Sequence, residues 1–106
     1  MNDPVRISGT LLAHGRCYVQ PDGTAWVQVE FNQRGSQLAV RASRRIGQGP
    51  AAQIAASNAA HHLRAGARVT VHAARFDIVL GRQPYLVLLE VRAIEHEPVL
   101  PASQAA

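Results

Sequence analysis

The chain has 106 residues, 47% of them apolar and 5% aromatic, so it can bury one core built mainly from Val, Leu, Ile and Ala. Its formal net charge of +4 comes with eleven arginines and no lysine, which favours anionic partners, although a GC-rich genome also supplies arginine in place of lysine. The lone Cys17 excludes an intrachain disulfide and a cysteine-based metal site. No apolar run approaches the roughly 20 residues that span a bilayer, and the first residues lack a signal-peptide pattern, so we expect a soluble, cytoplasmic protein.

Alternating apolar and polar residues predict three strands, at residues 5–13, 24–31 and 36–43. The turn before the second strand, PDGT, combines a proline with Asp-Gly, which is the chemistry of a tight β-turn. In the second strand, TAWVQVEF, one face carries the apolar residues Ala25, Val27, Val29 and Phe31, and the other carries Thr24, Trp26, Gln28 and Glu30. The only tryptophan of the chain is therefore expected on the polar face.

An alanine-rich segment at residues 51–66 predicts a helix that starts near Pro50 and stops at Gly66, with a stripe formed by Ala52, Ala55, Ala59 and Leu63. Two more strands are predicted at residues 67–80 and 85–96, and residues 98–106 are expected to be a flexible C-terminal tail. Three strands, a helix and two strands follow the order of the OB-fold, a five-stranded Greek-key barrel with its helix between strands three and four. We therefore expect an all-β fold with one helix, as a single OB-fold domain over residues 1–97.

Four short segments carry a family resemblance: RISGTL, PDGTAWVQVEF, LRAGARVTVHA and LLEVRAIEH. They are similar to strands of bacterial single-stranded DNA-binding proteins, and the chain resembles most closely the primosomal replication protein N branch of that family. The resemblance covers residues 5–96 and implies an OB-fold that binds single-stranded DNA, typically as a homodimer, among replication proteins. The segment RRIGQGPAAQIAASN departs from the family, and the tail PASQAA lacks the acidic, Phe-ending tip that recruits other enzymes.

The outward faces of the second and third strands are expected to form the groove for a single strand of nucleic acid. Trp26 offers a ring on which a base can stack, Gln28 shares its face, and Arg41 lies on the neighbouring strand. The other candidates, from nearby turns and the last hairpin, are Arg34, Arg44, Arg45, Arg82 and Tyr85. Alternatives stay open: Trp26 as cover for the barrel or as part of a subunit interface, a strand phase shifted by one residue, and each arginine as a plain solvated charge.

A homodimer or higher homo-oligomer is predicted from the last strand. If Val87, Leu89, Val91 and Ala93 face the core, then Leu86 and Leu88 face outward as an apolar patch that soluble monomers tend to avoid. We therefore expect these two leucines in an oligomer interface. The alternative is that the helix or the tail covers them within one chain.

No cofactor, metal site or catalytic centre is predicted. The five histidines lack metal-ligand spacing, and no catalytic triad, paired carboxylates or phosphate loop is present in the sequence. The sequence therefore predicts a binding protein rather than an enzyme: one that binds single-stranded DNA with little sequence specificity, in replication, replication restart or a mobile-element process. Three alternatives are RNA in place of DNA, an OB-fold assembly subunit that binds protein, and a small-barrel enzyme or ligand carrier that uses the histidines.

Overall fold

A computed structural model describes residues 4–33 and 35–97 of the chain. The elements are β1 (Val5–Leu11), β2 (Arg16–Val19), β3 (Thr24–Gln33), β4 (Ala39–Gln48), α1 (Pro50–His61), β5 (Arg68–Val79) and β6 (Tyr85–His96). The expectation of an all-β fold with one helix is confirmed. The predicted tail at residues 98–106 lies outside the described residues. No helix within the described residues is long and apolar enough to cross a membrane.

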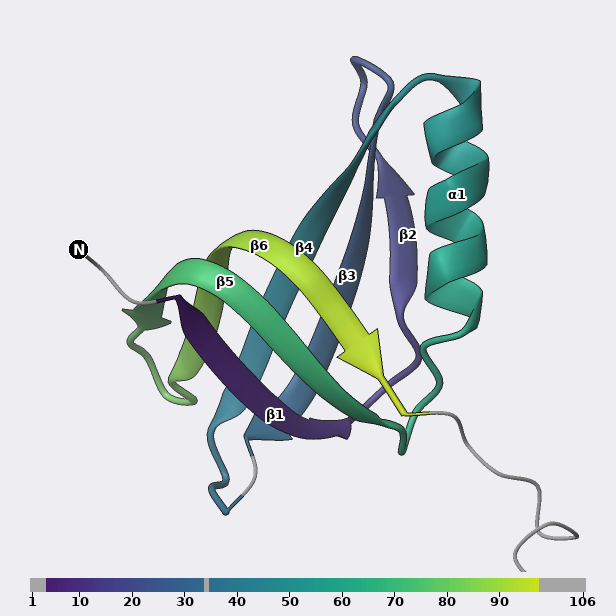
Figure 1. Cartoon of the computed structure of the whole chain (residues 1–106). Coiled ribbons are helices and arrows are strands. Elements are labelled where there is room, and N and C mark those ends of the chain that lie inside the picture. The colour runs from purple at the N-terminus through teal and green to yellow at the C-terminus, as the bar shows by residue number, and fades with distance from the viewer. Residues whose placement is uncertain (1–3, 34, 98–106) are drawn as a thin grey trace, which may run out of the picture.

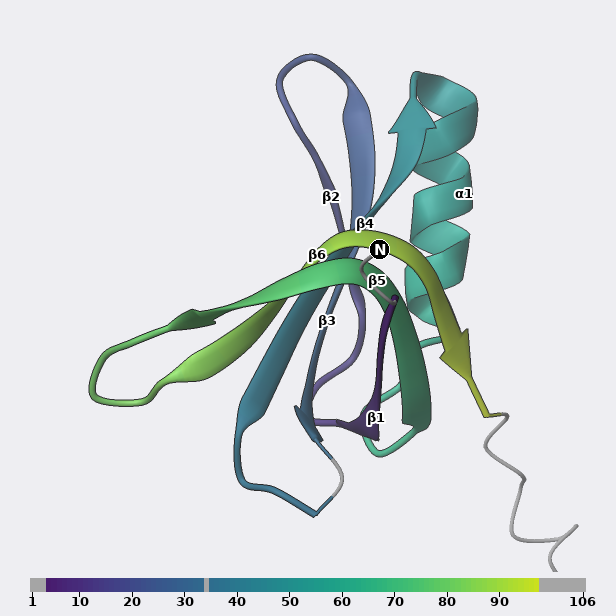
Figure 2. The same ribbon diagram turned by 60° about the vertical axis from the view of Figure 1, so that its left-hand side comes forward.

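The strands form one sheet in the order β1-β5-β6-β4-β3-β2, and β1 also pairs with β3. This additional pairing closes the sheet into a ring of β1, β3, β4, β6 and β5, with β2 attached outside the ring to β3 (Figure 1). All neighbouring strands are antiparallel except β4 and β6, which run parallel. The turned view shows β5 and β6 extending as a long hairpin to one side of the ring (Figure 2).

Glycine allows β1 to contact two partners at once. Gly9 pairs with Gln33 of β3 and with Val69 of β5, and its Cα is buried between them. A Cβ at this position would collide with the backbone carbonyl oxygen of Asn32 and would lie 2.5 Å from Cδ2 of Phe31. The ring therefore closes at a place where only a residue without a side chain fits.

The predicted strand phase of TAWVQVEF is confirmed. Ala25, Val27, Val29 and Phe31 are buried, and Trp26 lies half-buried on the outward face. Thr24 is an exception, since it is buried although it was expected outward.

Helix α1 lies beside β2, β3 and β4 and covers the core there (Figure 1). It begins at Pro50, as predicted, but ends at His61 rather than Gly66. The prediction of a longer helix was wrong because the following residues bond to the β1–β2 connection: Gly15 donates to the Leu63 carbonyl at 2.6 Å, and the Ala65 amide donates to Nδ1 of His14 at 3.0 Å.

The predicted stripe of the helix was also partly wrong. The buried helix residues are Ala56 and Ala60, followed by Leu63 just beyond the helix, whereas Ala55 is exposed. The buried face of the helix is therefore formed by alanine side chains.

Strand β2 was not predicted. It has four residues, RCYV, and within residues 4–33 and 35–97 its one strand partner is β3. Cys17 is half-buried and the other three residues are exposed. The two faces of the strand therefore differ little in hydrophobicity, and the sequence pattern does not reveal it. The expectation of five strands was therefore wrong by this one additional strand at the edge of the sheet.

The assignment of Leu86 and Leu88 to an oligomer interface was wrong. Both are buried within one chain, at 5% and 3% exposure, and they pair with Val40 and Ala42 of β4. Further along β6 the inward phase changes, because Glu90 adopts a left-handed backbone with φ 54° and the register with β5 shifts beyond it. Even-numbered residues, Leu86 and Leu88, therefore face the core in the first half of β6. Beyond Glu90 the alternation is broken, and Val91 and Ile94 pack against the core.

Candidate nucleic-acid interface

The outward faces of β2, β3 and β4 are placed side by side by the strand register. Residues that pair directly across strands point to the same face of a sheet. Three successive cross-strand rungs on this face are Tyr18–Trp26–Arg45, Arg16–Gln28–Ser43 and Glu30–Arg41. The predicted residues Trp26, Gln28, Arg41 and Arg45 therefore share one surface.

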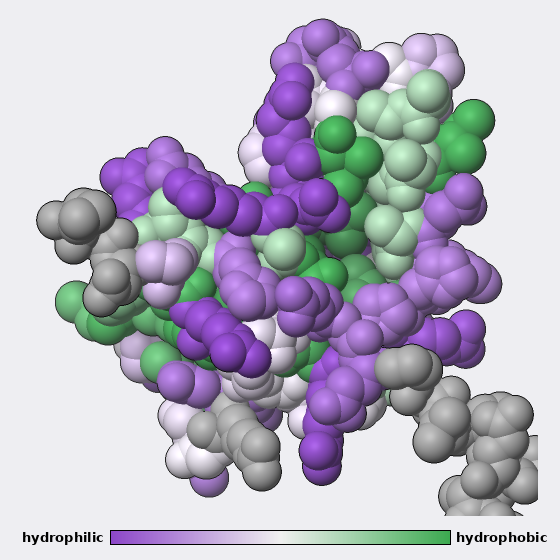
Figure 3. All heavy atoms as spheres, in the orientation of Figure 1, coloured by the Kyte–Doolittle hydropathy of each residue, from purple (hydrophilic) through white to green (hydrophobic). Residues whose placement is uncertain are grey.

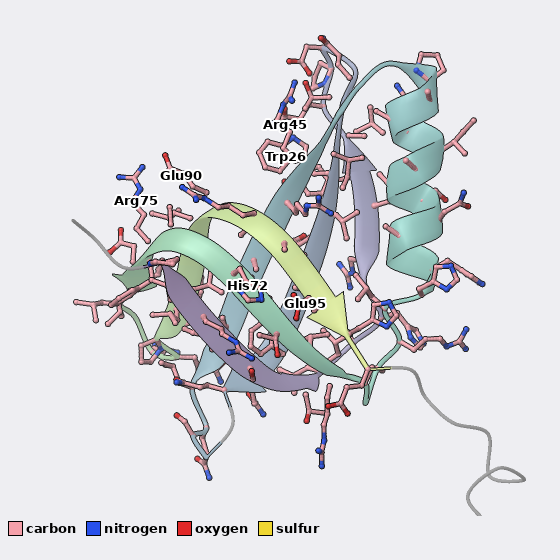
Figure 4. The ribbon with its side chains drawn as sticks, viewed as in Figure 1. Trp26, Arg45, His72, Arg75, Glu90 and Glu95 are labelled. Carbon is pink, nitrogen blue, oxygen red and sulfur yellow. The ribbon has the colours of Figure 1, made fainter. Side chains whose placement is uncertain are left out.

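We call Tyr18, Trp26 and Arg45 the aromatic rung. The rings of Tyr18 and Trp26 are parallel within 2°, with centroids 6.1 Å apart, which is an offset arrangement that leaves part of each ring face uncovered. The Trp26 Nε1–H is buried and has no acceptor among the described residues. Arg45 is exposed on the other side of Trp26 (Figure 4). The rung thus combines two aromatic rings and a guanidinium on the face turned away from α1.

A hollow lies next to the aromatic rung on the same face. Its volume is about 310 Å³, and its polar lining includes Arg16, Gln28, Glu30 and Arg41. The two guanidinium groups and the one carboxylate give these charged side chains a net positive charge. An anionic group seated here would be adjacent to the two rings.

Arg41 is held by two neighbours. Its Nε donates to Oε2 of Glu30 at 3.1 Å, and its guanidinium carbon lies 4.1 Å from the centroid of the Tyr85 ring. The ion pair is about half exposed, and exposed pairs of this kind contribute little and exchange readily. The guanidinium covers one face of Tyr85, so Tyr85 offers less stacking surface than the sequence indicated.

Arg44 does not lie where the sequence prediction placed it. It pairs with Val27, an inward residue, and it lines a cavity of about 140 Å³ with Ile46 and His62 on the α1 side of the sheet. The prediction assumed that the strand ended at Ser43, but β4 continues to Gln48 and its alternation continues with it. Arg44 and Arg45 therefore occupy opposite faces.

The last two predicted groups are remote from the aromatic rung. Arg82 is exposed in the turn between β5 and β6. Tyr85 pairs with Ala39, six positions before Arg45 along β4, which corresponds to roughly 20 Å of extended strand. Arg34 lies outside the described residues.

Sequence reasoning missed Arg16 and Tyr18 because it missed β2. One signal was available: the Pro-Asp-Gly turn opens β3, and a hairpin turn requires a strand on both sides. Directly before that turn, polar or amphipathic residues (Arg16, Tyr18, Gln20) alternate with Cys17 and Val19, which is the pattern of the preceding hairpin strand.

The β2–β3 turn beside the aromatic rung is held by Asp22. Its Oδ1 accepts the Thr24 amide at 2.9 Å, and its carbonyl accepts Nε2 of Gln48. Hydrogen bonds from Thr24, first the amide and then the hydroxyl, lower the pKa of Asp22, and the charge of Arg45 acts in the same direction. The turn is thus tied to both Thr24 and the end of β4.

This lowered pKa predicts an acid-sensitive turn. The carboxylate stabilises the fold fully above the ordinary pKa of an aspartate, and that stabilisation is lost as the pH falls through the lowered pKa of the folded state. We expect Asp22→Asn to be stable but to show a flatter decline of unfolding free energy with acid, as measured by urea denaturation at a series of pH values. If the unfolding free energies of the two proteins fell equally with decreasing pH, Asp22 would not have this role.

The histidines do not gather around a metal position. No group of three or more His, Cys, Asp or Glu residues within residues 4–33 and 35–97 could hold a metal ion. His62 instead stacks on His96, with ring centroids 6.4 Å apart.

Neither a protein-family model nor a curated protein matches the sequence of this chain.

Proposed function

We propose that this chain is an OB-fold protein that binds single-stranded DNA with little sequence preference. Support for the fold comes from the closed ring of β1, β3, β4, β6 and β5, in which α1 follows the third ring strand and β4 runs parallel to β6. A five-stranded Greek-key barrel has this strand order and this helix position. In this reading β2 is an extra strand that widens the binding face.

The observation that carries the proposal is the aromatic rung beside the basic hollow. Every base offers a π-face, so two parallel rings whose faces are partly uncovered can bind bases without selecting one of them. Arg45 and the hollow lined by Arg16 and Arg41 are suited to the phosphates on either side of a stacked base. The positive net charge adds a general attraction to the nucleic-acid backbone.

The chain contains one tryptophan, so its fluorescence reports directly on this site. Titration with oligo(dT) is expected to quench Trp26 and to saturate, because a stacked base contacts the indole. Duplex DNA of equal length is the control, since its bases are already stacked on one another. No quenching and no retardation of labelled oligo(dT) in gels would reject the proposal and favour a protein-binding assembly subunit.

Oligo(U) in the same titration separates DNA from RNA. Comparable affinity for both would assign the site to single-stranded nucleic acid in general, because the proposed contacts are to phosphates and base faces rather than to the sugar. The resemblance of RISGTL and PDGTAWVQVEF to the single-stranded DNA-binding family supports DNA, and replication or replication restart as the process served.

Two adjacent arginines on opposite faces of β4, Arg44 and Arg45, provide a matched test of the phosphate contacts proposed for DNA binding. Arg45→Ala is expected to reduce the magnitude of the log–log salt slope of oligo(dT) binding by about 0.7, the value for one phosphate contact on a single strand. Arg44→Ala removes the same charge from the α1 side, and we expect its slope to equal that of the unaltered protein. Equal slopes for both variants would remove Arg45 from the phosphate path.

A further inference from the structure

The β5–β6 hairpin carries the most exposed apolar side chains of the sheet. Phe76, Ile78 and Leu80 are 53%, 49% and 84% exposed. The space-filling view shows hydrophobic side chains on the side where this hairpin projects (Figure 3). Three large apolar residues close together in the sequence form a patch that needs an explanation.

These residues continue the core beyond its covered part. Phe76 pairs with Leu88 and Ile78 pairs with Leu86, so all four side chains share one face. Leu86 and Leu88 are buried against β4, whereas Phe76 and Ile78 lie one strand further out. The apolar layer of the protein therefore ends at an open margin.

The same margin is a strand edge. On its β1 side, β5 is paired from Arg68 to Ala73, where Ala73 lies opposite Val5. Among the described residues, no strand pairs with residues 74–79 on that side, while β6 pairs with them on the other. An edge with unpaired backbone groups and an apolar face is a template for another strand.

The sequence at this edge is complementary to itself. Around Phe76 stand Arg75 and Asp77, one positive and one negative. When two copies of a strand pair antiparallel about a two-fold axis at Phe76, each Arg75 lies directly opposite Asp77 of the second copy, and the two phenylalanines face each other. A two-fold interface requires such a self-complementary surface.

Both charged groups are able to make this contact. Arg75 Nε lies 3.8 Å from Oε2 of Glu90, a long contact between side chains that are each about two-thirds exposed (Figure 4). Such a pair is weak and yields to a better partner. Asp77 uses Oδ1 to accept its neighbouring Ile78 amide, and its side chain is otherwise exposed on the hairpin.

We propose that residues 74–78 of β5 pair with the same residues of a second copy of this chain, forming an antiparallel two-fold dimer centred on Phe76. The pairing extends the sheet across both subunits and covers Phe76 and Ile78. It replaces the interface through Leu86 and Leu88 that the sequence indicated, and it does not depend on nucleic-acid binding.

Charge exchange tests both the dimer and its register. Sedimentation equilibrium of the full chain is expected to show twice the chain mass of 11.4 kDa. Arg75→Asp and Asp77→Arg each place like charges opposite one another twice per dimer, so each is expected to weaken the dimer at least about tenfold. The double variant Arg75→Asp/Asp77→Arg restores opposite charges with the composition unchanged, and it is expected to dimerise like the unaltered protein.

Arg64→Asp is the control, because it makes the same charge change at an exposed position after α1. It should leave the mass unchanged, and circular dichroism should show every variant folded. A monomer at all concentrations overturns the proposal. Single reversals that leave the dimer intact, or a double variant that stays monomeric, overturn it equally, because each contradicts pairing in this register.

Discussion

Gly9→Ala is expected to destabilise the fold by about 3 kcal/mol or more, the upper end of the cost of overpacking. The added Cβ meets the carbonyl oxygen of Asn32, which is backbone and cannot rotate away, and Cδ2 of the buried Phe31. Relief requires β1 to move away from β3, which opens the ring where it is closed by only three paired positions. Urea denaturation followed by circular dichroism measures the change.

Gly81→Ala is the matched control for this substitution. A Cβ on Gly81 has no atom within 4 Å, and its φ is not in the positive range. We expect its unfolding free energy to change by less than about 0.5 kcal/mol, as for most surface substitutions. If the two alanine variants proved equally stable, Gly9 would not be the constraint on closure that its contacts indicate.

Trp26→Ala is expected to weaken oligo(dT) binding by about 1–3 kcal/mol, which is the contribution of one base stacked on an aromatic ring. This corresponds to a loss of affinity of roughly 5- to 150-fold. The indole lies on the outward face and is only half-buried, so the protein should remain folded. Because the variant lacks its fluorescent probe, fluorescence anisotropy of labelled oligo(dT) measures the affinity.

Two further variants separate stacking from support of the sheet. Trp26→Phe keeps a ring and should retain most of the affinity, whereas Tyr18→Ala removes the parallel neighbour and should lose affinity as Trp26→Ala does. An unfolded Trp26→Ala protein would instead assign the indole to the structural role considered among the alternatives. Full affinity in a folded Trp26→Ala protein would exclude the aromatic rung as a binding site.

The orientation of a strand can be predicted from the sequence only where its two faces differ clearly in hydrophobicity. TAWVQVEF has strong contrast, and the placement of Trp26 outward and Phe31 inward follows from it. YLVLLEV is apolar on both faces, so its phase cannot be determined from alternation. Leu86 and Leu88 were assigned to the wrong face because the left-handed backbone at Glu90 has no sequence signature in a non-glycine residue.

The candidate site was predicted in part for the same reason. Trp26, Gln28 and Arg41 came from strands whose alternation is clear, whereas Arg45 was expected just after a strand that in fact continues to Gln48. Tyr18 came from a short strand visible only through its pairing, and Arg41 proved to be shared between Glu30 and Tyr85. Pairing and side-chain partners depend on the register between strands, which a single sequence does not specify.

The two partners of β1 impose an order on the biosynthesis of this chain. Its contacts with β3 join residues about 20 positions apart, but the hydrogen-bonded hydroxyls of Ser8 and Thr70 are separated by 62 positions. During translation, β1 can therefore meet β3 early, yet its other edge stays open until β5 has left the ribosome. Residues 68–73 must emerge before β1 is paired on both sides, and sheets built from such distant segments fold slowly compared with locally paired ones.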